Sequence, residues 1–305
     1  MHRVVTIAAD SVSSGHAHAL EYCRQLEAGN ILLFPQSPIE LAAEDLAFLR
    51  GLEHSHRSLH KNLAYKPLQD RIAGAKLESN DPAASERLLR ILRGYSQSAL
   101  YFLGGFLYPY AQRWQVDYAS FRPLEEQGRA LPLHKRNDLL HTDAFPTRPT
   151  HGARILRFFT NIHPTQSREW RIGEPFRALA PQFAPAKIPL PDAEGALPRT
   201  LRSTLGRTPL GKAWPALRRS PYDRCMLRFH DGLKEDAAYQ AMGKHVDVSL
   251  PPGSSWMVYT DSVPHAVLSG KFALEQTILV APEAMVAPEE SPLAVLESLA
   301  GHRLV

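Results

Sequence analysis

The stretch LPPGSSWMVYTDSVPHAV, residues 250–267, decides the fold. It contains the end of one strand, a Pro-Pro-Gly turn, and a strand rich in aromatic and β-branched residues over 255–260. A short turn follows, and a third strand starts at His265. The stretch therefore predicts a run of antiparallel β-structure with His265 at the start of a strand.

An HTD triplet at residues 141–143 lies far upstream. In an extended strand the side chains at i and i+2 point to the same face, so His141 and Asp143 would reach one point in space. A histidine from another strand, His265, would complete a set of two histidines and one carboxylate. Such a set leaves three positions of an octahedral ion open, as a non-haem Fe(II) oxygenase requires for a bidentate co-substrate and for O2.

A second His-x-Asp triplet begins at His245 and competes with the first. His265 is only 20 residues from His245, which leaves room for little more than one hairpin, but it is 124 residues from His141. We therefore assign the metal to His141, Asp143 and His265, and we interpret the second triplet as a solvated strand start.

Composition limits the possible classes of protein. The chain has 305 residues, 44% of them hydrophobic, a net charge of +4 and a pI near 9.1, which mildly favours acidic partners. Its two cysteines have no metal or redox spacing, and no signal peptide or apolar run of about 20 residues is present. No nucleic-acid module, phosphate-binding glycine loop or nucleophile elbow is visible. We therefore expect a soluble, cytoplasmic protein without a transmembrane segment.

The fold class that these patterns predict is mixed α/β with a mainly β core, a double-stranded β-helix (jelly-roll, cupin-like) with flanking helices. We expect a helical N-terminal region over 1–110, packed on the barrel, in which Asp81 caps a helix that starts at Pro82. The catalytic core is expected over 111–285, with a basic, Pro- and Arg-rich insertion at about 184–221. A C-terminal helix is expected within 286–305.

If the co-substrate is 2-oxoglutarate, a cation must hold its distal carboxylate. Many such oxygenases place an arginine about ten positions after the distal histidine, but Gln276 stands there in this chain. Arg157 is a better candidate because it shares a strand face with Phe159 and Asn161 and would need an anion inside the barrel. The alternative is that Arg157 forms a structural ion pair. Arg122 is a second candidate, and Asn161 could add a hydrogen bond.

His230 lies in the phrase MLRFHDG, which we interpret as part of a strand. Because Asp231 is its neighbour, the two side chains would face opposite sides of that strand and could not bind one ion together. His230 would then face the substrate or support a metal ligand; the alternative is an ordinary strand histidine.

The basic insertion is the candidate for substrate contacts, because clustered guanidinium groups suit phosphates and carboxylates. Trp214, within it, could rest on a membrane surface. The alternative is a solvated loop. The substrate-binding candidates are Arg202, Arg207, Arg218 and Arg219.

Four phrases, in order, carry a resemblance to a known family: KRNDLLHTDAFPTRPTHGARILRFFTNIHP, REWRIGEPF, MLRFHDGLKEDAAYQ and VPHAVLSGKFALEQT. They resemble the Kdo 3-hydroxylases of Gram-negative bacteria, Fe(II)- and 2-oxoglutarate-dependent dioxygenases that convert the Kdo sugar on lipid A to Ko during lipopolysaccharide biosynthesis. The resemblance implies iron ligands at His141, Asp143 and His265, and O2 as the oxidant. It also implies Kdo-bearing lipid A as substrate and peripheral contact with the cytoplasmic face of the inner membrane.

Three alternatives stay open. A 2-oxoglutarate oxygenase could act on another small acid. A Zn-dependent hydrolase could use the same three ligands without O2. A non-catalytic sugar- or lipid-binding barrel would tolerate the loss of Asp143.

Overall fold

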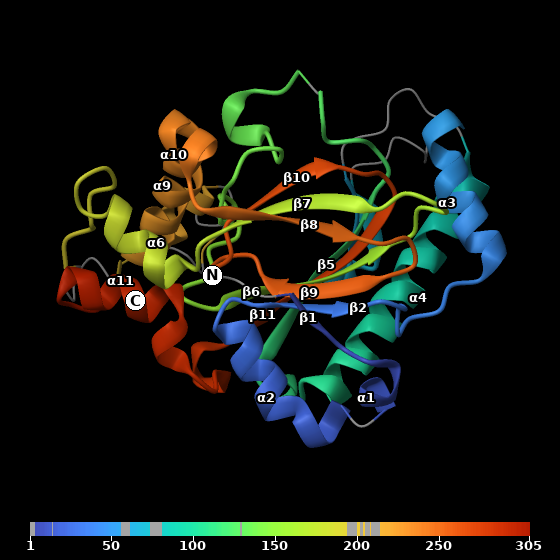
Figure 1. The fold of residues 1–305 in the computed structure, drawn as a ribbon, viewed down its shortest axis with the longest axis horizontal. Coiled ribbons are helices and arrows are strands. Elements are labelled where there is room, and N and C mark those ends of the chain that lie inside the picture. Colours follow the sequence, from blue (N-terminus) through green and yellow to red (C-terminus); the bar gives the residue numbers. More distant parts are fainter. Residues whose placement is uncertain are drawn as a thin grey trace.

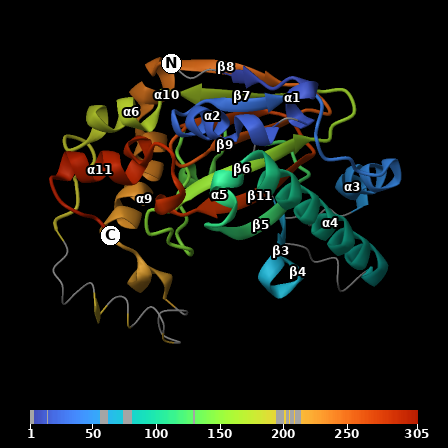
Figure 2. The ribbon, with the colours of Figure 1, turned by 90° about the horizontal axis from the view of Figure 1, so that it is seen from below.

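The computed structural model describes residues 4–13, 15–55, 62–73, 81–128, 130–193, 200–201, 204, 208 and 214–305. The strands in these residues form two sheets, an eight-stranded sheet of order β1-β2-β9-β6-β11-β5-β3-β4 and a three-stranded sheet of order β10-β7-β8 (Figures 1 and 2). Their bounds are β1 Val4–Thr6, β2 Ile31–Phe34, β3 Leu63–Lys66, β4 Arg71–Ala73, β5 Trp114–Arg122, β6 Arg154–Asn161, β7 Arg168–Gly173, β8 His245–Leu250, β9 Ser255–Tyr259, β10 His265–Ser269 and β11 Ala273–Val280.

The two sheets face each other as a double-stranded β-helix, which confirms the predicted fold class. The central strands β5, β11, β6 and β9 of the larger sheet pair antiparallel with one another, and so do β10, β7 and β8 of the smaller one. An antiparallel bridge between His141 and His265 adds the HTD segment to the smaller sheet. The fold thus places the HTD segment directly beside the start of β10.

Strand β6 shows how the sequence fills both faces of the larger sheet. Leu156 and Phe158 belong to the hydrophobic core under the helices, whereas Phe159 belongs to the core between the two sheets. Arg157 and Phe159 line the interior of the barrel, as their shared strand face predicted. Because both faces are covered, every residue of β6 is buried.

Helices α2 and α4 cover the outer face of the larger sheet (Figures 1 and 2). The helix predicted after Asp81 is present as α4, and the Asp81 carboxylate accepts a hydrogen bond of 2.9 Å from the backbone N–H of Ala84. The helices of the described residues are α1 Ala9–Ser13, α2 Gly15–Glu27, α3 Ala43–Ser55, α4 Pro82–Phe106, α5 Tyr108–Ala111, α6 Phe176–Phe183, α9 Pro221–Glu235, α10 Ala237–Met242 and α11 Pro292–Ala300. None of them is both long and apolar enough to cross a membrane.

The N-terminal region is less purely helical than expected. It also contributes β1 to β4, which extend the larger sheet at both edges. Strand β2, ILLF, pairs with β9 and is almost fully buried. Its four apolar residues have no helical or strand period of their own, so periodicity could not separate a short strand from part of a helix.

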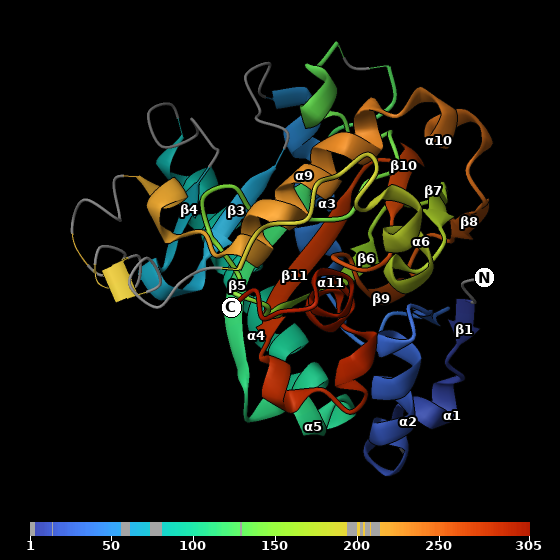
Figure 3. The same cartoon turned by 90° about the vertical axis from the view of Figure 1, so that its left-hand side faces the viewer.

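The phrase MLRFHDG lies in helix α9, so its interpretation as a strand was wrong. Helix α9 starts with a capping box in which Ser220 and Asp223 bond each other's backbone and side chains. Its buried side chains include Met226, Phe229 and Leu233, which recur at helical spacing. This face packs with α6 and α11 in a separate hydrophobic cluster at one end of the barrel (Figure 3).

Candidate metal centre and its cavity

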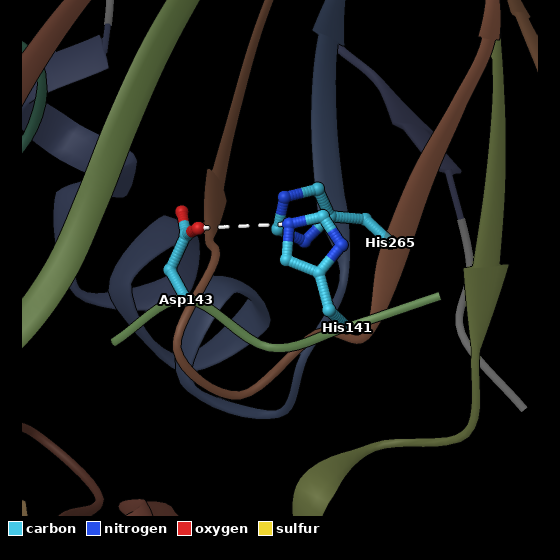
Figure 4. Close-up of side chains that lie close together, drawn as sticks. All are labelled: His141, Asp143 and His265. Carbon is cyan, nitrogen blue, oxygen red and sulfur yellow. Dashed lines mark ion pairs between the residues drawn. The ribbon is translucent and has the colours of Figure 1, made fainter. Parts of the chain in front are cut away.

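His141, Asp143 and His265 lie close together (Figure 4), and the ring of His141 contacts His230 of α9. One potential ligand atom from each residue lies within 4.8 Å of the other two, and Asp143 Oδ1 is 3.9 Å from His141 Nε2. The backbone sets this arrangement. His141 and His265 exchange two backbone hydrogen bonds of 2.9 and 3.2 Å, and the Asp143 N–H donates to the Thr260 carbonyl at 2.8 Å.

The hydrogen bonds of both histidines leave Nε2 available for a metal. Nδ1 of His141 donates to the Leu139 carbonyl at 2.7 Å, and Nδ1 of His265 donates to the Val263 carbonyl at 2.9 Å. A carbonyl can only accept, so Nδ1 carries the proton and the lone pair stays on Nε2. Burial lowers the pKa of both imidazoles, and each lies close to other cationic or imidazole groups. Both histidines are therefore neutral near pH 7, which is the form that binds a metal.

Asp143 is held as a carboxylate by Arg157. Burial alone raises the pKa of Asp143, but the neighbours of the carboxylate, with the Arg157 guanidinium first among them, outweigh burial and hold that pKa well below its usual range. Arg157 Nη2 is 3.0 Å from Asp143 Oδ2, which leaves Oδ1 on the side of His141. Two neutral imidazoles and one ionised carboxylate with one oxygen engaged elsewhere fit a divalent iron centre with open positions.

Glu275 neutralises the arginines behind the centre. Its carboxylate lies 2.7 Å from Arg157 Nη1 and accepts a hydrogen bond of 2.7 Å from Arg122 Nε. Burial alone raises the pKa of Glu275, but these two guanidinium groups outweigh burial and lower it. Arg157 therefore makes the structural ion pairs that were its alternative interpretation, and it also borders the cavity.

His141, Asp143 and His265 line a cavity of about 340 Å³. Cationic and aromatic side chains dominate its wall: Arg122, Lys135, Arg157, Arg168, Phe145, Phe159 and Trp170. Asp143 is the only carboxylate residue among the described residues that line it. The excess of positive charge suits anionic ligands.

His230 reaches the site from helix α9 rather than from a strand. Its Nδ1 donates to the Thr142 carbonyl at 2.8 Å, and its ring packs edge-on against His141 with centroids 5.0 Å apart. This places His230 against a proposed metal ligand, where it fixes the position of the ring. Asp231 points elsewhere and approaches His134 at 3.9 Å.

The structure does not bring Asn161 and Gln276 to the cavity. The Asn161 amide donates to the carbonyls of Gln166 and Leu250. These hydrogen bonds hold the turn after β6 in place. Gln276 points to the helix side of the sheet, where its amide oxygen accepts from Ser96 Oγ at 2.7 Å. Neither amide has a place beside a co-substrate in this cavity.

The four arginines proposed for substrate contacts are only partly described. Arg218 lines a second cavity of about 220 Å³, together with Lys66 and Arg148. Arg219 donates to the Pro146 carbonyl. Arg202 and Arg207 lie outside the described residues.

Sequence reasoning missed two residues of the site. Arg168 and Trp170 occur in REWRIG, where strand alternation places both on the face that lines the cavity. The Trp170 ring stacks on His265 with centroids 5.2 Å apart.

The competing His245 begins β8, and Asp247 forms a surface ion pair of 2.7 Å with Arg171, so the second triplet is a strand start as predicted.

A double-stranded β-helix that brings two histidines and one carboxylate to its mouth defines the non-haem Fe(II), 2-oxoglutarate-dependent dioxygenases, and this chain is an enzyme of that class. The sequence model described as 3-deoxy-D-manno-oct-2-ulosonic acid (Kdo) hydroxylase matches residues 10–303. The chain therefore belongs to the Kdo hydroxylase family.

Solved structures agree with this assignment. The Kdo hydroxylase KdoO in complex with alphaketoglutarate and Fe(III) is 36% identical, with 99% of this chain and 97% of that chain covered and a TM-score of 0.81. The cobalt(II) complex of KdoO gives the same four values. The complex with succinate and Fe(III) is 34% identical over the same shares, again with a TM-score of 0.81. A comparison with curated proteins found no match.

Proposed function

We propose that this protein uses Fe(II), 2-oxoglutarate and O2 to hydroxylate C3 of Kdo on lipid A, giving Ko. The observation that carries the proposal is the convergence of His141, Asp143 and His265 on a cavity walled by cationic side chains. Iron bound there supplies the oxidation, in which 2-oxoglutarate and O2 yield succinate and CO2 and one oxygen atom becomes the new hydroxyl. Membership of the Kdo hydroxylase family supports the choice of sugar.

The chain's own residues prepare this chemistry. The carbonyls of Leu139 and Val263 hold the imidazoles with Nε2 toward the metal, and Arg157 holds Asp143 ionised. Phe145, Phe159 and Trp170 give part of the cavity an apolar, aromatic wall. The cationic wall attracts the two acids of the reaction, 2-oxoglutarate and the carboxylate of Kdo.

The test is a turnover assay with purified protein, Fe(II), 2-oxoglutarate, O2 and Kdo-bearing lipid A, followed by mass spectrometry of the lipid and by succinate release. We expect the lipid to gain one oxygen in a 1:1 ratio to succinate. His141→Ala should abolish both, while His245→Ala, in the second triplet, should leave both unchanged. Succinate without a modified lipid would support the dioxygenase reaction and contradict the proposed substrate. If iron-loaded protein forms neither succinate nor modified lipid, the result would favour the hydrolase or the binding protein.

A second part of the proposal concerns the membrane. We propose that the basic insertion contacts the cytoplasmic face of the inner membrane, where its substrate is anchored. Trp214 is 64% exposed and lies a few residues from Arg218 and Arg219, an arrangement that suits an anionic lipid surface. In vesicle sedimentation, binding should require anionic lipid, and Trp214→Ala should weaken it. Met242→Ala, at an exposed apolar residue outside the insertion, is the control. Equal binding by both variants would reject this contact.

A further inference from the structure

The second cavity, of about 220 Å³, lies beside strand β5 at the point where β3 ends. The last pair between these strands joins Tyr65 to Ala119, and β3 ends one residue later at Lys66. Residues 115–118 of β5, beyond this last pair, form one wall of the cavity. The cavity shares no lining residue with the cavity at the proposed metal centre, so it is a separate site.

The wall of the second cavity carries an excess of positive charge. It contains Lys66, Arg148 and Arg218, which come from the end of β3, from the segment after the HTD triplet and from the end of the basic insertion. Asp117 is the only carboxylate residue among the described residues of this wall, and it pairs with Arg148. Lys66 and Arg218 form no ion pair with a carboxylate of the described residues. Two cations are therefore available to an anionic ligand.

The position of Arg218 is fixed by its neighbour in the chain. Arg219 donates two hydrogen bonds, of 2.6 and 3.1 Å, to the Pro146 carbonyl. Pro146 lies two residues before Arg148, in the segment that follows the HTD triplet. The end of the basic insertion is thus attached beside the cavity that Arg218 lines.

Asp117 adds a hydrogen-bond acceptor that is not satisfied. The residue is only 9% exposed; its Oδ1 accepts from Arg148, and its Oδ2 has no hydrogen-bond partner among the described residues. A buried carboxylate oxygen without a donor is unfavourable, and a hydroxyl group of a ligand would supply the donor. The cavity therefore suits a ligand that carries both an anionic group and hydroxyl groups, as a phosphorylated sugar does.

A row of contacts between arginines and aromatic rings connects this cavity to the metal centre. Phe145, two residues after Asp143, lines the first cavity, and its ring centre is 5.7 Å from the guanidinium carbon of Arg157. The guanidinium carbon of Arg148 is 4.4 Å from the same ring centre and 4.0 Å from that of Tyr118, which lines the second cavity. Phe145 and Arg148 therefore lie between the two cavities, and an acceptor with several sugars can occupy both.

We propose that the second cavity binds a phosphate group on a sugar of the acceptor while the Kdo sugar lies at the metal centre. Lys66 and Arg218 bind the phosphate, and Asp117 accepts a hydrogen bond from a hydroxyl group of the same sugar. Two available cations match the charge of about −2 on a phosphate monoester better than the single charge of a carboxylate. The inference rests on the proposed function, because it assumes phosphorylated, Kdo-bearing lipid A as the acceptor.

The experiment compares two soluble acceptors that differ only in phosphate. Kdo-bearing lipid A is freed of its fatty chains, and a portion is then treated with phosphatase. Both acceptors are titrated by calorimetry into Co(II)-loaded protein that contains 2-oxoglutarate, in the absence of O2. We expect wild type to bind the phosphorylated acceptor about 10–100-fold more tightly, which is the effect of one or two hydrogen bonds to a charged group.

Lys66→Gln and Arg218→Gln should each reduce this preference by about 3–10-fold, and the double variant should abolish it. The affinities for Co(II) and for the phosphatase-treated acceptor should stay at the wild-type values, which also shows that the variants fold. Arg171→Gln, at a surface ion pair with Asp247, is the matched control and should keep the full preference. A double variant that keeps the preference would overturn the proposal, and so would equal binding of both acceptors by wild type.

Other sources of an anionic group give different results in the same titrations. If inorganic phosphate alone binds as tightly as the phosphorylated acceptor, the ligand is free phosphate and the proposal is wrong. If the double variant loses binding to phosphatidylglycerol vesicles but keeps its preference for the phosphorylated acceptor, the two cations contact membrane lipid instead. If the double variant binds the phosphatase-treated acceptor more weakly and wild type shows no preference for phosphate, the cavity binds a carboxylate, which also contradicts the proposal.

The titrations do not depend on turnover, so the two proposals can fail separately. A protein that binds the phosphate through Lys66 and Arg218 but does not hydroxylate Kdo would contradict the proposed function alone. A protein that hydroxylates Kdo but shows no preference for the phosphorylated acceptor would contradict this inference alone.

Discussion

At the scale of single residues, Arg157 connects the proposed metal ligand Asp143 to the rest of the barrel. It contacts Asp143 through Nη2 and Glu275 through Nη1. Groups that orient a metal ligand commonly change metal affinity by about 10–100-fold when they are removed. We therefore expect the loss of Arg157 to affect metal affinity more directly than the affinity for the co-substrate.

Arg157→Met should lower Co(II) affinity by about 10–100-fold, because Asp143 loses the cation that orients it and keeps it ionised. The measurement is a Co(II) titration followed by absorption. Arg87→Met, at a surface ion pair with Asp45, is the control and should behave as wild type. Unchanged Co(II) affinity together with a weaker affinity for 2-oxoglutarate would instead return Arg157 to the role of co-substrate anchor.

Gly270 determines the position of Arg168. Its φ of +114° is one that other residues rarely adopt, and a Cβ there would lie 2.9 Å from Arg168 Cα. Gly270→Ala should therefore destabilise the protein by about 1–3 kcal/mol. Urea unfolding measures this loss of stability. Wild-type stability in the variant would show that the turn between β10 and β11 relaxes without strain.

At the scale of elements, helix α9 links the barrel to the cluster of helices beside it. It supplies His230 to the site, and its first turn is fixed by Asp223, which is 6% exposed. The Asp223 carboxylate accepts hydrogen bonds from Ser220, Thr150 and His151. Burial alone raises the pKa of Asp223, but His151 and Ser220 outweigh burial and lower it.

The lowered pKa gives a pH dependence with a definite sign. Asp223 stabilises the folded protein above its unfolded pKa of about 3.9, and this stabilisation is lost as the pH falls through the lower folded pKa. Asp223→Asn should cost about 1–3 kcal/mol near pH 7, and its difference from wild type should shrink below about pH 4. Urea unfolding between pH 6 and pH 3 measures both. A difference that stays constant over this range would contradict the assignment.

At the scale of the whole molecule, the proposed metal joins segments that are distant in sequence. His141 and Asp143 lie before β6, whereas His265 begins β10. A metal that binds only the folded barrel stabilises it by about 2.7 kcal/mol at a concentration 100-fold above its Kd. Binding should therefore raise the unfolding temperature.

We expect Co(II) to raise Tm by several degrees and a chelator to reverse the rise. His141→Ala should remove the effect, and His245→Ala should keep it, because His245 lies outside the ligand set. Differential scanning calorimetry measures the change. An equal rise in His141→Ala would show that the metal binds elsewhere.

Local patterns predicted much of this protein correctly. The β-rich stretch that contains His265, the strand that carries Arg157, and the helix capped by Asp81 all follow from side chains that are close in sequence. The secondary structure of short segments was harder to predict from the sequence. ILLF became a strand because β9 lies beside it, and MLRFHDG became a helix because its apolar face packs on α6 and α11.

The sequence by itself determined the class of fold and identified the HTD triplet and His265 as candidate ligands. The signals for this, strand alternation of side chains and turn residues, act over a few positions. Only the tertiary structure decided how the buried arginines are paired. Arg122 and Arg157 meet Glu275 through the pairing of β5, β6 and β11, while Arg168 donates a hydrogen bond to the Gly270 carbonyl. Burial and ion pairing depend on the register of strands more than 100 residues apart, and no local pattern records that register.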